Sequence, residues 1–172
     1  MTKCLASCLL TVACLLSATG GTEAQDPNRY YRIKNVNSKK VLSVDDKGKD
    51  EGDRIIQVVP ADSDLQQWKF VKSGDYFKIV NRKSGLALNV KDGAKKRGAP
   101  VIQWDAKEAG ENSEWRLEKK GEHYAIKARH SGMVLDVAQA SEERRSSLIQ
   151  YPFKESNNEN QLFELVLVKD KK

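Results

Sequence analysis

The chain has 172 residues and a formal net charge of +6, with 30 lysines and arginines against 24 aspartates and glutamates. This length is sufficient for one domain and a short additional segment. Basic stretches such as KDGAKKRG (91–98) alternate with acidic ones such as EAGENSE (108–114). The charge pattern therefore indicates a solvated surface and argues against a nucleic-acid partner, while leaving weak attraction to anionic polymers open.

The first predicted element is a secretory signal peptide over residues 1–24. Lys3 supplies the positive start, and CLASCLLTVACLL (4–16) is an apolar segment too short to span a bilayer. The small residues Thr22 and Ala24 fit the usual cleavage pattern, so we expect cleavage after Ala24. The prediction is a secreted or extracytoplasmic protein without a membrane span.

A lipoprotein signal is the alternative for this segment. Cys8 has a fitting lipobox but little apolar chain before it, whereas Cys14 has the apolar chain but a poor lipobox. In either case all three cysteines precede the predicted domain, residues 25–172. That domain can contain no cysteine nucleophile, thiolate metal site or disulfide, and it is long enough to fold without one.

Three similar segments follow along the chain. They share an aromatic residue, then an isoleucine, then a polar residue that varies from Ser43 to Asn89 to Asp136; the segments are YYRIKNVNSKKVLSV (30–44), YFKIVNRKSGLALNV (76–90) and HYAIKARHSGMVLDV (123–137). Each continues to a matching string (IIQV, VIQW, LIQY) and closes on an aromatic (QQWKF, SEWRL, QLFEL). The alignment predicts three repeats of about 46 residues, spanning 28–73, 74–120 and 121–169.

Within each repeat the residue pattern is typical of β-strands. Apolar and polar residues alternate over four to six positions, and Ser-Gly, Asp-Gly or Lys-Gly turns separate the runs. No stretch keeps a helical period long enough to predict a helix. About four strands per repeat predict an all-β domain of about twelve short strands, in which three repeats enclose a shared core. Trp68, Trp115 and Phe163, which close the repeats, are predicted core residues.

The triple repeat, with its Gln-x-Trp-like closing element and SG-x-x-L-[ND]-V strand, resembles the ricin B-chain-like lectin family. The resemblance covers about residues 28–169 and implies a β-trefoil that binds sugars in shallow pockets, one possible in each repeat. It implies a carboxylate or amide from the LDV-type strand, an aromatic platform from the VIQW-type strand and an asparagine before the closing aromatic. These groups suit a pyranose, because carboxylate and amide oxygens accept from its hydroxyls and an aromatic ring packs on its C–H face.

The resemblance assigns the ligand residues unequally to the three repeats. The third repeat has the complete set of carbohydrate-binding residues: Asp136, Tyr151, Asn160 and Gln161. The second repeat has Asn89, Trp104 and Asn112, but Ser113 replaces the usual glutamine and a neutral amide replaces the carboxylate, which predicts a weaker site. The first repeat has Ser43, Val58 and Leu65 at these positions, which predicts a structural role.

The preferred interpretation is therefore a non-enzymatic carbohydrate-binding protein that needs no cofactor and no metal. A protein-interaction or inhibitor module is the second interpretation, although inhibitors of this fold usually depend on disulfides. An enzyme is the third, but the chain has no GxSxG, HExxH or P-loop motif and no His-rich metal spacing. The fold alone does not choose among them, so the choice depends on the site.

Overall fold

The computed structural model describes residues 26–45, 48 and 50–169. The predicted signal peptide lies outside these residues and stays a prediction. Within the described part of the chain, no helix has the length and apolar character needed to cross a bilayer.

The described residues form twelve strands, which confirms the predicted all-β fold. The strands are β1 (Tyr31–Asn35), β2 (Val41–Val44), β3 (Ile55–Val58), β4 (Trp68–Ser73), β5 (Tyr76–Asn81), β6 (Ala87–Val90), β7 (Val101–Trp104), β8 (Glu114–Lys120), β9 (His123–Ala128), β10 (Val134–Val137), β11 (Leu148–Tyr151) and β12 (Phe163–Leu167). Short 3-10 turns lie between them: η1 (Asp64–Gln66), η2 (Lys91–Gly93), η3 (Glu111–Ser113), η4 (Ala138–Ala140) and η5 (Glu159–Gln161).

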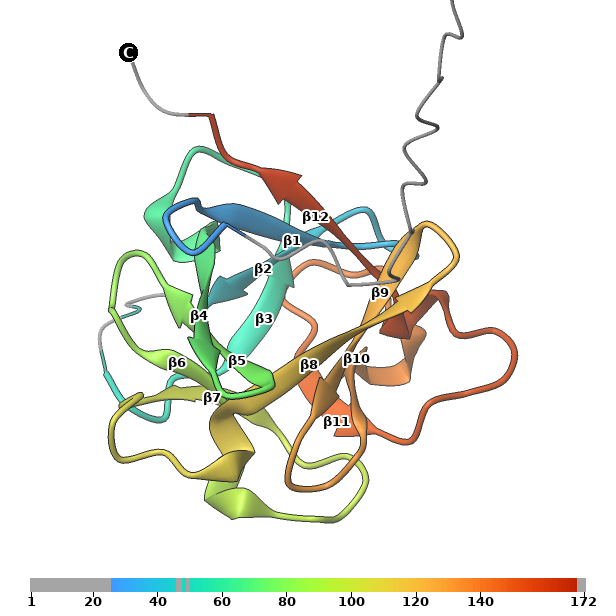
Figure 1. Cartoon of the computed structure of the whole chain (residues 1–172). Coiled ribbons are helices and arrows are strands. Elements are labelled where there is room, and N and C mark those ends of the chain that lie inside the picture. The colour runs from blue at the N-terminus through green and yellow to red at the C-terminus, as the bar shows by residue number, and fades with distance from the viewer. Residues whose placement is uncertain (1–25, 46–47, 49, 170–172) are drawn as a thin grey trace, which may run out of the picture.

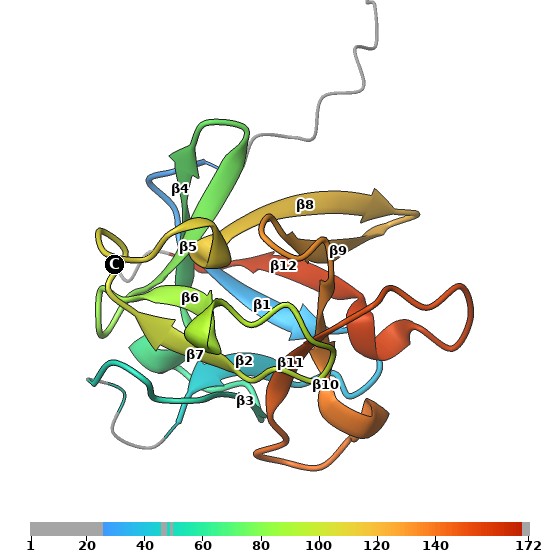
Figure 2. The same cartoon turned by 90° about the horizontal axis from the view of Figure 1, so that it is seen from below.

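Six of these strands close a barrel. The antiparallel pairings run in the order β1, β4, β5, β8, β9 and β12, and β12 pairs with β1 to complete the ring (Figure 1). The other six strands form the hairpins β2–β3, β6–β7 and β10–β11, whose strands are seen from below in Figure 2. The first strand of each hairpin also pairs with β1, β5 or β9. A barrel with three such hairpins is a β-trefoil, as predicted.

The closing aromatics lie in the core, as predicted. Trp68, Trp115 and Phe163 are fully buried and belong to one apolar cluster drawn from all three repeats. The indole N–H of Trp68 donates to the carbonyl of Leu42 over 3.2 Å, and that of Trp115 donates to the carbonyl of Leu88 over 2.9 Å. These bonds satisfy the one polar atom of each buried indole and fix β2 and β6 against the barrel.

The strands β2, β6 and β10 place their variable polar residue on the face away from the core. Successive side chains of a strand point to opposite faces. In β10, Leu135 and Val137 belong to the core cluster, so Asp136 between them faces outward. Asn89 in β6 and Ser43 in β2 alternate with core residues in the same way. The polar column of the sequence therefore forms the floor of three equivalent surface positions.

A buried glutamine in each hairpin holds a loop of a neighbouring repeat; we call Gln57, Gln103 and Gln150 the glutamine clamps. Gln150 donates through Nε2 to the carbonyls of Ala94 and Lys96 over 2.6 and 2.9 Å. Its backbone N–H bonds the Ala99 carbonyl, and its own carbonyl accepts from Gly98.

The other two glutamine clamps repeat this arrangement around the barrel. Gln103 bonds the carbonyl of Asp50 in the first repeat, and Gln57 bonds the carbonyls of Ser141 and Glu143 in the third. Each repeat thus anchors the loop of the repeat before it, and the first repeat anchors that of the last. Each surface position is therefore bordered by residues of two repeats.

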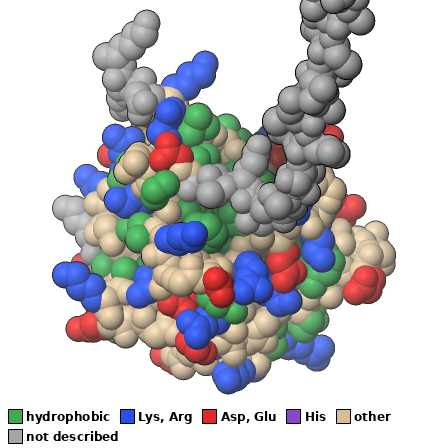
Figure 3. Space-filling view, in the orientation of Figure 1, with side chains coloured by type: hydrophobic (Ala, Val, Ile, Leu, Met, Phe, Trp, Pro, Cys, Tyr) green, Lys and Arg blue, Asp and Glu red, His purple; other side chains and the backbone are tan. Residues whose placement is uncertain are grey.

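Charged side chains are interspersed on the surface. On the face seen in Figure 3, lysines and arginines alternate with aspartates and glutamates, without a large region of one sign. This distribution agrees with the solvated surface expected from the sequence.

Candidate functional site

The largest of the three pockets over the hairpins lies on β10–β11. It has a volume of about 550 Å³ and is lined by Asp136, Tyr151 and Asn160, three of the four residues predicted for the third repeat. Asp136 pairs with Ile149, so Tyr151 lies two residues further along the same face of the hairpin. Gly98, from the loop held by a glutamine clamp, also lines the pocket.

Asp136 is held as a buried carboxylate at the base of this pocket. Its side chain is only 4% exposed, and burial raises its pKa above the ordinary value of 3.8. A hydrogen bond from Gln161, the positive charge of Lys154 and a hydrogen bond from Asn160 oppose this shift. A carboxylate that is both desolvated and pre-oriented forms strong hydrogen bonds to ligand hydroxyls.

Gln161 lies behind the pocket and positions its carboxylate. It is fully buried, and its Nε2 donates to Asp136 Oδ2 over 2.8 Å and to the Pro152 carbonyl over 2.9 Å. Its Oε1 accepts from the backbone N–H of Lys154 over 2.9 Å. Gln161 therefore serves the site through Asp136 and through the loop, and it is not among the described residues that line the pocket.

Lys154 is a lining residue that the sequence analysis missed. Its Nζ donates to Asn160 Oδ1 over 2.5 Å, while Asn160 Nδ2 donates to the Val137 carbonyl over 3.0 Å. The repeat alignment gives only a weak signal for it, because the second repeat has a lysine, Lys107, at the corresponding loop position but the first repeat has Ala61. The pocket thus presents a carboxylate, an ammonium group, an amide and an aromatic ring together.

The second repeat brings its three predicted residues together in a smaller pocket of about 270 Å³. Asn89 is buried, and its Oδ1 accepts from Asn112 Nδ2 over 3.1 Å. Asn112 also donates to the carbonyl of Val90, as Asn160 does to that of Val137. The ring of Trp104 is 36% exposed, so it can offer a face to a ligand.

In the second repeat, Ser113 stands at the position of Gln161 but does not take over its hydrogen bonds. Ser113 is fully buried and donates to the carbonyl of Gly110 over 2.9 Å, so it does not reach Asn89. Instead Asp105 closes the preceding turn by accepting from the backbone N–H of Lys107 over 2.5 Å. Asn89 therefore lacks the formal charge of Asp136. It also lacks a glutamine partner such as Gln161, which orients Asp136 in the third repeat.

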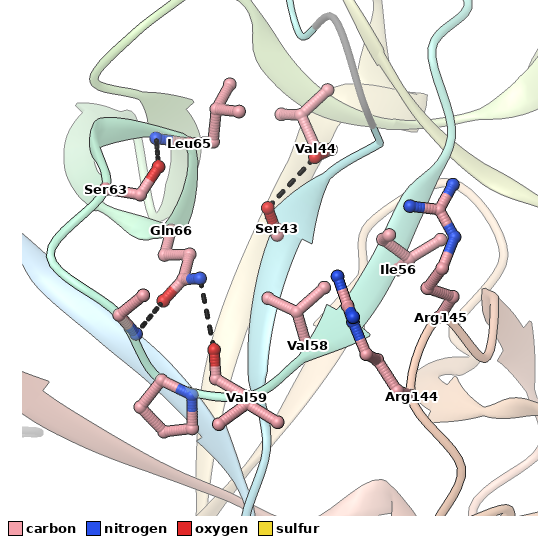
Figure 4. Close-up of a pocket in the computed structure, with 12 residues that line it drawn as sticks. Ser43, Val44, Ile56, Val58, Val59, Ser63, Leu65, Gln66, Arg144 and Arg145 are labelled. Atoms are coloured by element: carbon pink, nitrogen blue, oxygen red, sulfur yellow. Dashed lines mark hydrogen bonds between the residues drawn. The ribbon is translucent and has the colours of Figure 1, made fainter.

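The first repeat also carries a pocket, of about 380 Å³, although its sequence predicted a structural role (Figure 4). Ser43, Val58 and Leu65 all line it. Gln66 takes the backbone bonds of Gln161, because it donates to the Val59 carbonyl and accepts from the Ala61 N–H. Arg144 and Arg145 from the third repeat line its other side, beside β3.

The chain matches a family model described as ricin-type β-trefoil lectin domain-like, over residues 17–104 and 111–172. No curated protein matches it. Among solved structures, the designed threefold-symmetric protein ThreeFoil is 38% identical with a TM-score of 0.75, covering 80% of this chain and 97% of its own. The exo-β-1,3-galactanase 1,3Gal43A from Clostridium thermocellum is also 38% identical, with a TM-score of 0.77, and the match covers 82% of this chain but 30% of the enzyme.

A more distant structure shares the fold. The ricin B-like lectin of Macrolepiota procera in complex with lactose is 16% identical, with a TM-score of 0.70, and the match covers 82% of this chain and 96% of that lectin.

Proposed function

Since this chain belongs to the ricin-type β-trefoil lectin domain-like family, we propose that it binds neutral sugar residues in the pockets of its third and second repeats. The observation that carries the proposal is the meeting of Asp136, Tyr151 and Asn160 around one pocket. Carboxylate and amide accept from sugar hydroxyls, and the tyrosine ring packs on the C–H face. The second pocket offers the amide of Asn89 in place of the Asp136 carboxylate, together with Trp104 and Asn112, and Asp92 and Glu108 also line it.

We propose that the protein acts as a binder and not as a catalyst. Glycoside hydrolysis commonly uses two carboxyl groups on opposite sides of the scissile bond. Among the described residues lining the third-repeat pocket, Asp136 alone carries a carboxylate. Since the related galactanase has a larger chain, a domain of this kind also occurs within an enzyme. The proposal for this chain therefore depends on its pockets.

The proposal is tested by comparing the protein with a Tyr151→Ala, Trp104→Ala double variant on an array of neutral glycans. We expect the protein to bind at least one neutral glycan and the variant to lose this signal, because both C–H packing surfaces are removed. Thermal unfolding of both proteins checks that the variant is folded. Binding of a neutral sugar should change little between low and high salt, since hydroxyl hydrogen bonds are weakly screened. An unchanged array profile in a folded double variant would contradict the proposal.

As the pH falls, binding to the third-repeat pocket should weaken, and the weakening should begin at a higher pH than for an aspartate with an ordinary pKa. Burial raises the pKa of Asp136, and the ligand hydroxyls need its ionised form as acceptor. Calorimetric titration of a neutral sugar in a pH series from neutral to acid measures the effect, with Asp136→Asn as the pH-insensitive control. If both proteins show the same profile, the carboxylate is not the acceptor.

The raised pKa of Asp136 also makes the folding stability depend on pH, and this dependence is opposite in sign to that of ligand affinity. A raised pKa in the folded state means that folding favours the protonated carboxyl group. The stabilising contribution of Asp136 is thus complete below the pKa of the unfolded chain and is lost as the pH rises through the folded-state pKa. Ligand-free stability and ligand affinity should therefore follow opposite trends with pH across this window.

A further inference from the structure

The pocket of the first repeat has polar chemistry opposite to that of the other two. Ser43 Oγ donates to the Val44 carbonyl over 2.9 Å, and both ends of the Gln66 amide bond backbone groups. Val58 stands where the other repeats have an aromatic ring. Among the described residues lining this pocket, none carries a carboxylate. Its strong polar groups are the two guanidinium groups, which only donate hydrogen bonds.

Arg144 and Arg145 reach this pocket from the third repeat. Figure 4 shows both side chains beside β3, on the side away from Leu65 and Gln66. Arg145 forms an ion pair with Asp45 at 2.5 Å. The side chain of Arg144 forms no hydrogen bond or ion pair with any described residue, so its donors are available to a ligand.

The backbone on either side of Arg144 is held in place by a glutamine clamp. Gln57 donates to the carbonyl of Glu143 over 2.8 Å, and its own carbonyl accepts from the backbone N–H of Arg145 over 2.8 Å. The Gln57 N–H in turn donates to Ser146. The guanidinium group of Arg144 therefore extends from a positioned loop, which reduces the ordering that binding requires.

The conformation of Arg145 supports a role for this loop. Gly52, Gly98 and Arg145 make the same backbone bond to a glutamine clamp, and all three have positive φ angles, of 87°, 80° and 71°. Glycine adopts this region freely, whereas a residue with a Cβ is strained there. The third repeat thus places an arginine where its two counterparts have glycine. Such a backbone outlier is a reason to look for a function.

We propose that the pocket of the first repeat binds an anionic sugar residue, bearing a carboxylate or a sulfate, through Arg144. The planar guanidinium group forms paired hydrogen bonds to either anion. Arg145 also lines the pocket and adds a second positive charge there, while forming its ion pair with Asp45. Val44, Ile56, Val58 and Leu65 supply apolar contacts for the sugar ring. This site goes beyond the two pockets proposed above and does not depend on their binding a neutral sugar.

The test uses calorimetry with three disaccharides of equal size: neutral, uronic-acid-containing and sulfated. All titrations are done on the Tyr151→Ala, Trp104→Ala background, so that the other two pockets do not contribute. We expect at least one anionic disaccharide to bind and the neutral one not to bind. Arg144→Ala should weaken anion binding by tenfold or more. The two anionic arms show which group the pocket accepts.

Arg97→Ala is the matched control. Arg97 precedes Gly98 as Arg144 precedes Arg145, but it is not among the described residues that line the three hairpin pockets. The Arg97→Ala variant removes the same charge as Arg144→Ala but should weaken binding of the anionic disaccharide by less than threefold. Equal losses in the two variants would show that general surface charge attracts the anion and would overturn the proposal. Absence of anion binding on this background would also overturn it, whatever the result with neutral glycans.

Arg145→Gly separates the roles of the two arginines. We expect thermal stability to be maintained or raised, since glycine suits the positive φ angle. Anion binding should weaken, because the variant removes a guanidinium group that lines the pocket. Unchanged anion affinity in this variant would overturn the role given to Arg145.

Discussion

Replacement of Asp136 by alanine is expected to weaken neutral-sugar binding in the third repeat by tenfold to more than a hundredfold. The lost hydrogen bonds are charge-assisted and contribute about 1.5–3 kcal/mol. Calorimetry on a Trp104→Ala background, in which the second-repeat pocket lacks its ring, reports the third repeat alone. The variant should remain folded, because it removes a carboxylate whose burial already raises its pKa.

Asp136→Asn is the matched variant, since it reproduces the residue that the second repeat carries as Asn89. Its Oδ1 can still accept from Gln161, so the loss of affinity should be smaller than for alanine. This order would show that charge and position both contribute. Equal affinities for the protein and Asp136→Ala would mean that the sugar does not bind at this carboxylate.

Replacement of Gln150 by alanine is expected to lower the free energy of unfolding by about 2–4 kcal/mol. The substitution leaves the carbonyls of Ala94 and Lys96 without this donor and removes the acceptor of Ser131, and an unpaired buried polar group costs about 1–3 kcal/mol. Urea unfolding measures the change. Because Gly98 belongs to the same loop and lines the third-repeat pocket, sugar affinity should fall as well.

Gln150→Glu tests whether the two donated bonds are the cause. Glutamate has nearly the same shape and keeps an acceptor for Ser131, but its carboxylate cannot donate to the loop carbonyls. We expect it to be at least as destabilising as alanine at neutral pH. A glutamate variant as stable as the parent would show that this clamp contributes no stability.

The sequence predicted the fold well because the fold depends on patterns that occur within one repeat. Alternating apolar residues set the strands, and the closing aromatics Trp68, Trp115 and Phe163 mark the core. The variable polar residue must face outward, because it lies between two core residues of a short strand. The resemblance to the ricin B-chain-like lectin family grouped Asp136 with Tyr151 and Asn160, and the structure brings these three side chains to one pocket.

The alignment could not reveal contacts that cross from one repeat to another. Arg144 is about 100 positions from Ser43, and comparing repeats aligns it with Glu51 and Arg97, which have different surroundings. Lys154 was not predicted because only the second repeat has a lysine, Lys107, at the same loop position, and a loop lysine is ordinarily a solvated surface residue. The IQ pair in each hairpin string was visible, but a buried glutamine in sequence does not say which carbonyls it bonds.

Because each glutamine clamp brings a loop of one repeat to the pocket of another, a pocket does not coincide with a sequence repeat. A substitution in the loop 141–147 changes the pocket of the first repeat, while no described residue of that loop lines the pocket of its own repeat. Substitutions in this loop can therefore change the ligand preference of the first-repeat pocket without any change in the strands of the first repeat. Deleting one repeat would remove its own pocket and one wall of the next. Loss of any repeat would therefore affect two of the three pockets.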